Sequence, residues 1–137
     1  MFQVTFDAGD PHALAEFWAD VLGYEVEDHA ELVDSLVEAG RMAASDRIER
    51  DGRSAFADLA AARDPRGVAP RLLFQRVPEP KTAKNRVHLD VRVAEDRREA
   101  ESQRLAATGA TLLWVTRDRG SVTYTMQDPE GNEFCLD

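Results

Sequence analysis

The sequence has a single cysteine, Cys135, among its 137 residues. One cysteine cannot form an internal disulfide, and it leaves no cluster of thiolates for a zinc or iron–sulfur site. The chain also lacks any apolar run near the roughly 18 residues that a membrane span requires. Its first ten residues, MFQVTFDAGD, show no basic and apolar signal pattern. We therefore expect a cytoplasmic protein without a membrane partner.

Basic residues are few relative to acidic ones, 17 against 26, which gives a formal net charge of -9. Such a chain repels a phosphate backbone, so we expect no nucleic-acid partner. Hydrophobic residues make up 43% and charged residues 31% of the sequence, a balance typical of a folded globular protein. This length suits a single domain, and we expect one over residues 1–137.

The start of the chain predicts a strand followed by an amphipathic helix. Residues 2–8 alternate in polarity, with Val4 and Phe6 on one face, which is typical of a strand. Asp10 and Pro11 together are a typical helix start, and Gly23 is a typical helix stop. Apolar side chains recur between them at helical spacing: Leu14, Phe17, Trp18, Val21 and Leu22.

The rest of the chain predicts further strands and helices from shorter patterns. Runs of β-branched and aromatic residues favour strands, Gly109 favours a helix end, and the prolines at 78 and 80 favour a connector. We expect one or two surface helices over 24–53, strands over 54–62 and 71–77, a connector over 78–85, a strand over 86–93, a helix over 95–108, a hairpin of 111–115 with 121–127, and a last strand over 133–136.

Two halves of the chain repeat the same order of motifs. Val4-Thr5-Phe6-Asp7 matches Val87-His88-Leu89-Asp90, each is followed by a predicted helix, and each half later has an Asp-Pro-x-Gly turn before a strand. Such a duplication indicates two similar βαβββ units that pack around a shared cleft, because one unit cannot bury its own sheet face. We expect a first module over residues 1–77, the connector, and a second module over residues 86–137.

Several of these stretches together resemble one known protein family. They run over residues 10–24, 74–79, 84–90 and 128–135, and they leave about residues 25–57 without a match. The sequence is similar to the vicinal oxygen chelate superfamily, which includes glyoxalases, bleomycin resistance proteins and dioxygenases, and most of all to its glyoxalase-like branch. The resemblance implies an α+β fold of two pseudo-symmetric βαβββ modules, a curved sheet that bears a cleft, and a homodimer.

In metal-dependent members, the resemblance implies, His and Glu side chains from equivalent strands hold a divalent cation. His88 stands at one such position, but its counterpart is Thr5 or Gln3, and the two remaining positions carry Gln75 and Cys135. Amides and hydroxyls are poor ligands for a catalytic divalent ion. We therefore expect no cofactor and no usual metal site. A variant site, with His88 and Asp90 joined by Glu133 or Cys135, remains an alternative.

The candidate site residues are polar or aromatic positions on the predicted strands. His88 and Asp90 are the catalytic candidates, because an imidazole titrates near neutral pH and strand alternation puts both on one face. A structural role for His88 is an equally open interpretation, whereas an inert buried thiol is the favoured interpretation of Cys135. The ligand-binding candidates are Thr5, Asp7, Gln75, Trp114, Tyr124, Glu133 and Cys135.

Two functions are compatible with this pattern. In the first, the protein binds a small metabolite or antibiotic in the cleft between the modules, without the usual metal. In the alternative, it is a metal-dependent or His-assisted enzyme of the lyase or dioxygenase kind that acts on a small oxygenated substrate. The missing metal ligands favour the binding function, whereas the polar residues of the predicted cleft are compatible with the enzyme function. Fold alone does not decide between them.

Overall fold

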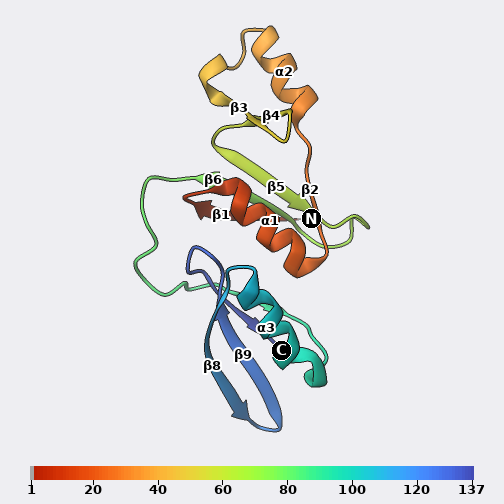
Figure 1. Ribbon diagram of the computed structural model, residues 1–137, viewed down its shortest axis with the longest axis vertical. Coiled ribbons are helices and arrows are strands. Elements are labelled where there is room, and N and C mark those ends of the chain that lie inside the picture. The colour runs from red at the N-terminus through yellow and green to blue at the C-terminus, as the bar shows by residue number, and fades with distance from the viewer. Residues whose placement is uncertain (1) are drawn as a thin grey trace. The chain divides into compact units, whose positions relative to one another are not determined.

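The computed structural model describes residues 2–137, which form two compact units, one ending at Pro78 and the other starting at Glu79 (Figure 1). We describe each unit by itself. Among residues 2–137, none of the helices combines the length and apolar composition of a transmembrane span.

The first unit is built on a four-stranded sheet with the strand order β1-β6-β5-β2. β1 and β6 are parallel, and the other neighbours are antiparallel. The elements of this sheet and its helix are β1 (Gln3–Ala8), α1 (Pro11–Leu22), β2 (Glu25–Val26), β5 (Leu59–Arg63) and β6 (Arg71–Arg76). The two outer strands, β1 and β2, thus come before a long insertion in the chain. The two inner strands, β5 and β6, come after it.

Helix α1 forms as its sequence predicts and covers one face of this sheet. The Asp10 side chain accepts hydrogen bonds from the backbone N–H groups of His12 and Ala13, and Gly23 ends the helix at a φ of 65°. Trp18 packs against Phe6, whose ring also stacks on Phe74, with centroids 5.3 and 5.1 Å apart. The core of the first unit therefore lies between α1 and the sheet, and the opposite sheet face is open.

The insertion corrects the prediction of one or two surface helices over 24–53. It holds one helix, α2 (Ala30–Glu38), a short 3₁₀ turn at Ala44–Asp46 (η1), and a hairpin of β3 (Arg47–Arg50) with β4 (Arg53–Phe56). Asp51 and Gly52 form its turn at φ angles of 49° and 74°, which is the Asp-Gly hairpin signal. The predicted strand over 54–62 was also wrong in extent, because β4 and β5 are separate strands that pair with different partners.

The second unit repeats the architecture of the first. Its sheet has the order β7-β10-β9-β8, with β7 and β10 parallel and the other neighbours antiparallel. The elements are β7 (Leu89–Val91), a 3₁₀ turn at Glu95–Arg97 (η2), α3 (Arg98–Ala107), β8 (Thr111–Asp118), β9 (Ser121–Gln127) and β10 (Glu133–Leu136). The predicted α+β fold of two βαβββ modules is confirmed.

The first strand of the second unit is shorter than predicted. Residues 86–93 were expected to be extended, but β7 covers only Leu89–Val91, and Val87 is 79% exposed. β-propensity favoured the longer strand, yet β10 pairs with only these three residues of β7. His88 therefore stands immediately before the strand.

The two Asp-Pro-x-Gly turns are built alike. Asp64 accepts hydrogen bonds from the backbone N–H groups of Arg66, Val68 and Ala69. Asp128 accepts hydrogen bonds from the backbone N–H groups of Glu130 and Asn132. Both aspartates are buried, and each satisfies backbone donors of its own turn.

Replacing Asp64 with alanine is expected to lower the melting temperature at neutral pH, because it leaves several turn N–H groups without an acceptor. These hydrogen bonds hold the pKa of the Asp64 carboxyl well below its usual range. Its stabilising effect is therefore present above the ordinary aspartate pKa and fades as the pH falls below it. Thermal denaturation monitored by circular dichroism checks this, with the exposed Asp58→Ala as control; equal melting temperatures for both variants would contradict it.

Candidate functional site

A row of side chains crosses the second sheet on the face opposite Phe134, exposed at its two ends and buried at Thr125. Asp90 pairs with Cys135, Cys135 with Thr125, and Thr125 with Trp114. Residues that are register partners on neighbouring strands point to the same side of a sheet. The row Asp90–Cys135–Thr125–Trp114, hereafter the second-sheet row, therefore lies opposite the buried face that carries Phe134.

His88 joins one end of the second-sheet row. Its Nδ1 lies 2.9 Å from Oδ1 of Asp90. A carboxylate oxygen accepts, so Nδ1 carries the proton, and in the neutral imidazole Nε2 then keeps its lone pair. His88, Asp90 and Cys135 each have one potential metal-ligand atom, and these three atoms lie within 4.8 Å of one another. The structure thus brings together three of the residues that the sequence nominated.

The Cys135 thiol is not set up as a nucleophile. Burial raises its pKa, and the neighbouring Asp90 carboxylate raises it further. The hydroxyl of Thr125 lies 3.8 Å from Sγ and acts in the opposite direction. A thiol with a raised pKa stays protonated at neutral pH and is inert until a cation or base removes the proton.

Glu133 is on the same strand as Cys135, two residues away, but its carboxylate has other partners. Nζ of Lys81 lies 3.1 Å from Oε1, and the backbone N–H of Asn85 donates to Oε2 at 3.0 Å. Burial acts to raise the pKa of Glu133, but these hydrogen bonds outweigh it and lower the pKa to about 2. Glu133 therefore fastens the segment before β7 to β10, and the structure does not bring it to His88.

The two aromatic candidates lie on opposite faces of the second sheet. Trp114 belongs to the second-sheet row and is 50% exposed. Tyr124 pairs with Leu136, on the face that is buried, and is only 9% exposed. The hairpin pattern placed both on the same pair of strands but did not distinguish the two faces, because β8 has an irregular register between Leu112 and Trp114.

In the first unit, Asp7 and Gln75 form the pair that matches Asp90 and Cys135. They are register partners on the parallel strands β1 and β6, and the Gln75 amide donates to Asp7 Oδ1 at 3.0 Å. Thr5 lies on the same open face, and all three side chains are exposed. The duplication therefore extends from the fold to the position of these polar pairs.

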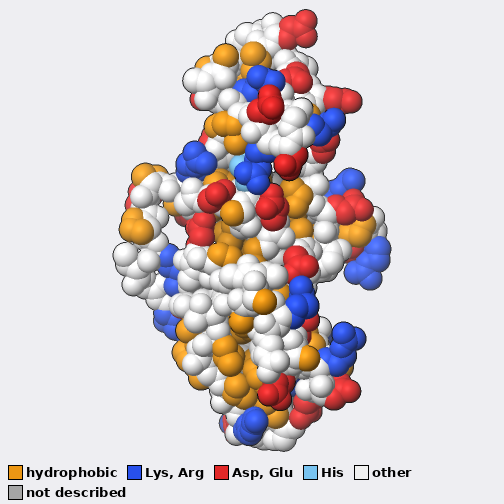
Figure 2. Space-filling model, in the orientation of Figure 1, with side chains coloured by type: hydrophobic (Ala, Val, Ile, Leu, Met, Phe, Trp, Pro, Cys, Tyr) orange, Lys and Arg blue, Asp and Glu red, His pale blue; other side chains and the backbone are white. Residues whose placement is uncertain are grey.

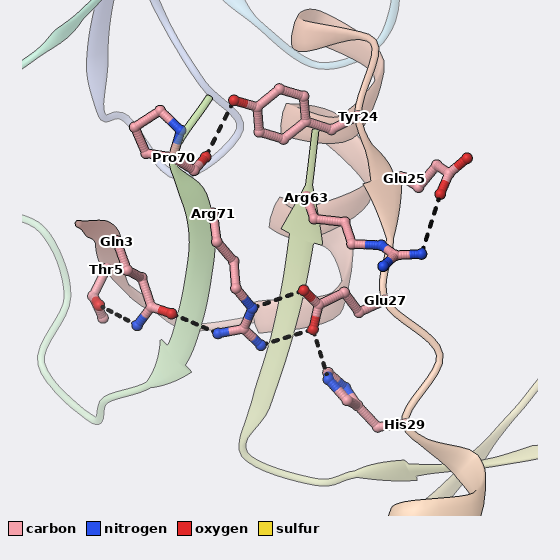
Figure 3. Close-up of polar contacts among 9 residues, drawn as sticks. All are labelled: Gln3, Thr5, Tyr24, Glu25, Glu27, His29, Arg63, Pro70 and Arg71. Atoms are coloured by element: carbon pink, nitrogen blue, oxygen red, sulfur yellow. Dashed lines mark hydrogen bonds and ion pairs between the residues drawn. The ribbon is translucent and has the colours of Figure 1, made fainter. Parts of the chain in front are cut away.

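Sequence reasoning missed a polar network next to Thr5, which Figure 3 shows. Arg71 donates to both oxygens of Glu27, at 2.7 and 2.8 Å, and to Oε1 of Gln3 at 2.6 Å. Nε2 of His29 lies 2.9 Å from Oε2 of Glu27. The Arg71 guanidinium holds the pKa of Glu27 below its usual value. No local signal could have found this network, because Arg71 joins Gln3 and Glu27, which are far from it in the sequence.

A sequence profile of the glyoxalase-like domain matches residues 3–136. The chain belongs to the glyoxalase-like domain family. It is thereby a member of the vicinal oxygen chelate superfamily. A comparison with curated proteins found no match.

Solved structures share the fold of this glyoxalase-like protein over nearly its whole length. One is a glyoxalase/bleomycin resistance protein/dioxygenase family enzyme from Burkholderia phytofirmans PsJN, with 15% identity, a TM-score of 0.64, and coverage of 98% of this chain and 94% of that one. Another is a possible glyoxalase from Bacillus cereus, with 16% identity, a TM-score of 0.61, and coverage of 99% and 96%.

A third similar structure is a variant of the fosfomycin resistance protein FosX from Listeria monocytogenes, complexed with Mn(II) and 1S,2S-dihydroxypropylphosphonic acid. It shares 12% identity, with a TM-score of 0.62 and coverage of 99% of this chain and 86% of that one. At such identities the likeness shows the fold alone.

The usual metal site of His and Glu ligands does not fit the residues present in this glyoxalase-like protein. Thr5 and Gln75 supply a hydroxyl and an amide, Gln75 is hydrogen-bonded to Asp7, and Cys135 stands where a glutamate is expected. Glu133 is held by Lys81. The imidazole, carboxylate and thiol at His88, Asp90 and Cys135 are instead a donor set that suits a softer cation such as zinc.

Proposed function

We propose that this glyoxalase-like protein binds a small oxygenated metabolite or antibiotic at His88 and the second-sheet row, without the family's usual metal. The observation that carries the proposal is the hydrogen-bonded His88–Asp90 pair at one end of a row of polar and aromatic side chains whose two ends, Asp90 and Trp114, are exposed. The proposal includes a homodimer, as the resemblance implies, and a cytoplasmic location, which the single cysteine favours.

The second-sheet row offers complementary contacts for such a ligand. With Nδ1 bonded to Asp90, the Nε2 lone pair of His88 can accept a hydrogen bond from a ligand hydroxyl. The half-exposed ring of Trp114 offers an apolar surface at the other end of the row. A few placed polar groups beside an aromatic wall are typical of small-molecule sites. FosX, a neighbour in fold, was captured with a dihydroxypropylphosphonic acid, which is a ligand of this class.

A second candidate function is metal-assisted chemistry, favoured by the convergence of His88, Asp90 and Cys135 within 4.8 Å. A divalent cation held there would polarise a substrate oxygen. The thiol would have to lose its proton to become a ligand, against its raised pKa. His88 would coordinate through Nε2, with Asp90 orienting the ring, or Asp90 would itself be a ligand.

Metal content of the natively purified protein separates the two candidates. We expect elemental mass spectrometry to find far less than one divalent ion per chain, both in the parent protein and in His88→Ala. We also expect a ligand to be found in a thermal-shift screen of small oxygenated metabolites and antibiotics, fosfomycin included. A ligand at a hundredfold excess over its dissociation constant should stabilise the protein by about 2.7 kcal/mol, and His88→Ala should lose this stabilisation.

The opposite result has a clear signature. Near-stoichiometric metal that disappears in both His88→Ala and Cys135→Ser, with the circular dichroism spectrum unchanged, would overturn metal-free binding and establish the second candidate. His12→Ala would be a poor control because His12 is buried. Glu79→Ala, at an exposed carboxylate outside the strands, is the matched variant that should change neither metal content nor ligand stabilisation.

A further inference from the structure

A cavity of about 300 Å³ is lined by residues of the first unit alone. It is formed where α1, the segment that leads into α2, the β3–β4 hairpin and the start of β5 meet. Its lining includes His12, Glu16, Glu27, His29, Arg50 and Phe56. Most of the residues that line the cavity lie in the stretch of about residues 25–57, which matches none of the family's sequence motifs.

Ion pairs hold the walls of this first-unit cavity together. Arg50 on the hairpin reaches Glu16 on α1, with 2.6 Å between Nη2 and Oε1. Arg53 on the same hairpin reaches Asp28 before α2, with 2.7 Å between Nη2 and Oδ2. Figure 2 shows basic and acidic side chains interspersed on the face of the first unit that is turned to the viewer. The cavity is thus bounded by tethered elements of one unit.

Both imidazoles of the cavity expose an unprotonated nitrogen when neutral. Nε2 of His12 lies 2.8 Å from the carbonyl oxygen of Phe56, and a carbonyl can only accept. Nε2 of His29 lies 2.9 Å from Oε2 of Glu27, whose lowered pKa keeps it an ionised acceptor. Each Nε2 therefore donates, so each neutral imidazole has an unprotonated Nδ1 that is able to accept a hydrogen bond.

The charges around the cavity favour a positive ligand. Four carboxylates line it, and Arg50, Arg53 and Arg71 pair with three of them, Glu16, Asp28 and Glu27. With Asp51 as the fourth carboxylate, its formal charge is negative by one, in a chain that is itself acidic. Its surface also includes the apolar side chains of Val26 and Leu59 and the ring of Phe56, which lies 5.6 Å from that of His29. A ligand that complements these walls has hydrogen-bond donors, positive charge and an apolar body.

We propose that the first-unit cavity binds a small organic cation, an ammonium or amidinium group attached to an apolar body. The cation would donate to imidazole Nδ1 and carboxylate oxygens, and the apolar body would lie against Phe56 and Leu59. The cavity is at the low end of the volumes of known ligand sites, so the ligand is small. This site is independent of the second-sheet row and of the function proposed for it.

Benzylammonium is a suitable probe, because it joins a primary ammonium to one aromatic ring. The full chain, labelled with ¹⁵N, is titrated with it at a pH where an ordinary imidazole is neutral, and backbone amide shifts are followed by NMR. We expect saturable shifts at the amides of Ala55 and Ala60, which line the cavity. Benzyl alcohol, which lacks the charge, and benzoate, which reverses it, should bind about tenfold more weakly or worse.

Two variants make the assignment specific. His29→Phe keeps a ring beside Phe56 but removes the Nδ1 acceptor, and Glu16→Gln removes one carboxylate charge; each should weaken binding about tenfold. Glu79→Gln removes an exposed carboxylate elsewhere and should leave affinity unchanged. Equal binding of benzyl alcohol, shifts confined to the second unit, or no saturable shift would each overturn the proposal. Amide spectra of the variants report whether they fold.

Discussion

Replacing Glu133 with alanine is expected to lower the free energy of unfolding by about 3 kcal/mol, near the lower end of the cost of breaking a buried ion pair. Glu133 is 8% exposed, and it accepts from Lys81 Nζ at 3.1 Å and from the Asn85 N–H at 3.0 Å. Its removal leaves a half-buried ammonium without its counter-charge and the Asn85 backbone N–H without its acceptor. Urea denaturation at neutral pH measures the loss.

Two further variants separate the charge from the hydrogen bond. Glu133→Gln keeps an acceptor for the Asn85 N–H but removes the charge, so it should lose less stability than Glu133→Ala. Glu79→Ala, at an exposed carboxylate, should be nearly neutral. If Glu133→Ala were as stable as Glu79→Ala, the ion pair would contribute nothing and the assigned role of Glu133 would be wrong.

The same contact makes acid sensitivity part of this prediction. The folded pKa of Glu133, about 2, lies below its ordinary value of 4.5. Its stabilisation is therefore complete above the ordinary value and is lost as the pH falls toward the folded one. The difference in unfolding free energy between the parent protein and Glu133→Gln should accordingly shrink over this acid range. A difference that grows on acidification would contradict the assignment.

Replacing Phe74 with alanine is expected to cost about 4 kcal/mol of unfolding free energy, the usual range for a fully buried phenylalanine. Phe74 is completely buried on β6 and stacks on Phe6. It lies next to Gln75, whose amide reaches Asp7 on the open face. Loss of its ring leaves a cavity between α1 and the sheet that the rigid strands cannot close.

Chemical denaturation measures this second effect, with Phe2→Ala as the matched control. Phe2 is 70% exposed, so its truncation should change stability by less than about 0.5 kcal/mol. Phe74→Leu retains much of the buried area and should fall between the two. If Phe74→Ala lost less than about 1 kcal/mol of unfolding free energy, the packing of this core would be wrongly assigned.

Several elements could be predicted because their signals are local. Asp10 and Gly23 delimit α1 through contacts within a few residues, and both Asp-Pro-x-Gly turns close on their own backbone. The Asp-Gly pair at 51–52 carried an equally local hairpin signal, which the charged helical pattern around it obscured. Strand β2 had no such signal, because its two residues are extended only through pairing with β5.

In the candidate site, too, local patterns predicted some features, and the pairing of distant strands decided the others. Alternation by itself predicted that His88 and Asp90 share a face, and they are hydrogen-bonded. The parallel pairing of β7 with β10 sets Cys135 opposite Asp90, and it joins strands more than forty residues apart in the chain. The role of Glu133 likewise depended on where the segment carrying Lys81 runs. The catalytic and ligand-binding roles of these residues remain predictions.

The sequence by itself determined the family, the duplicated order of strands and helices, and the aspartate-capped turns, because each depends on neighbouring residues or on a repeated pattern. Only the tertiary structure decided that Tyr124 is in the core while Trp114 is exposed, that Arg71 bridges Gln3 and Glu27, and that the insertion encloses a cavity. These features depend on register and packing between distant segments, for which no pattern of adjacent residues carries information.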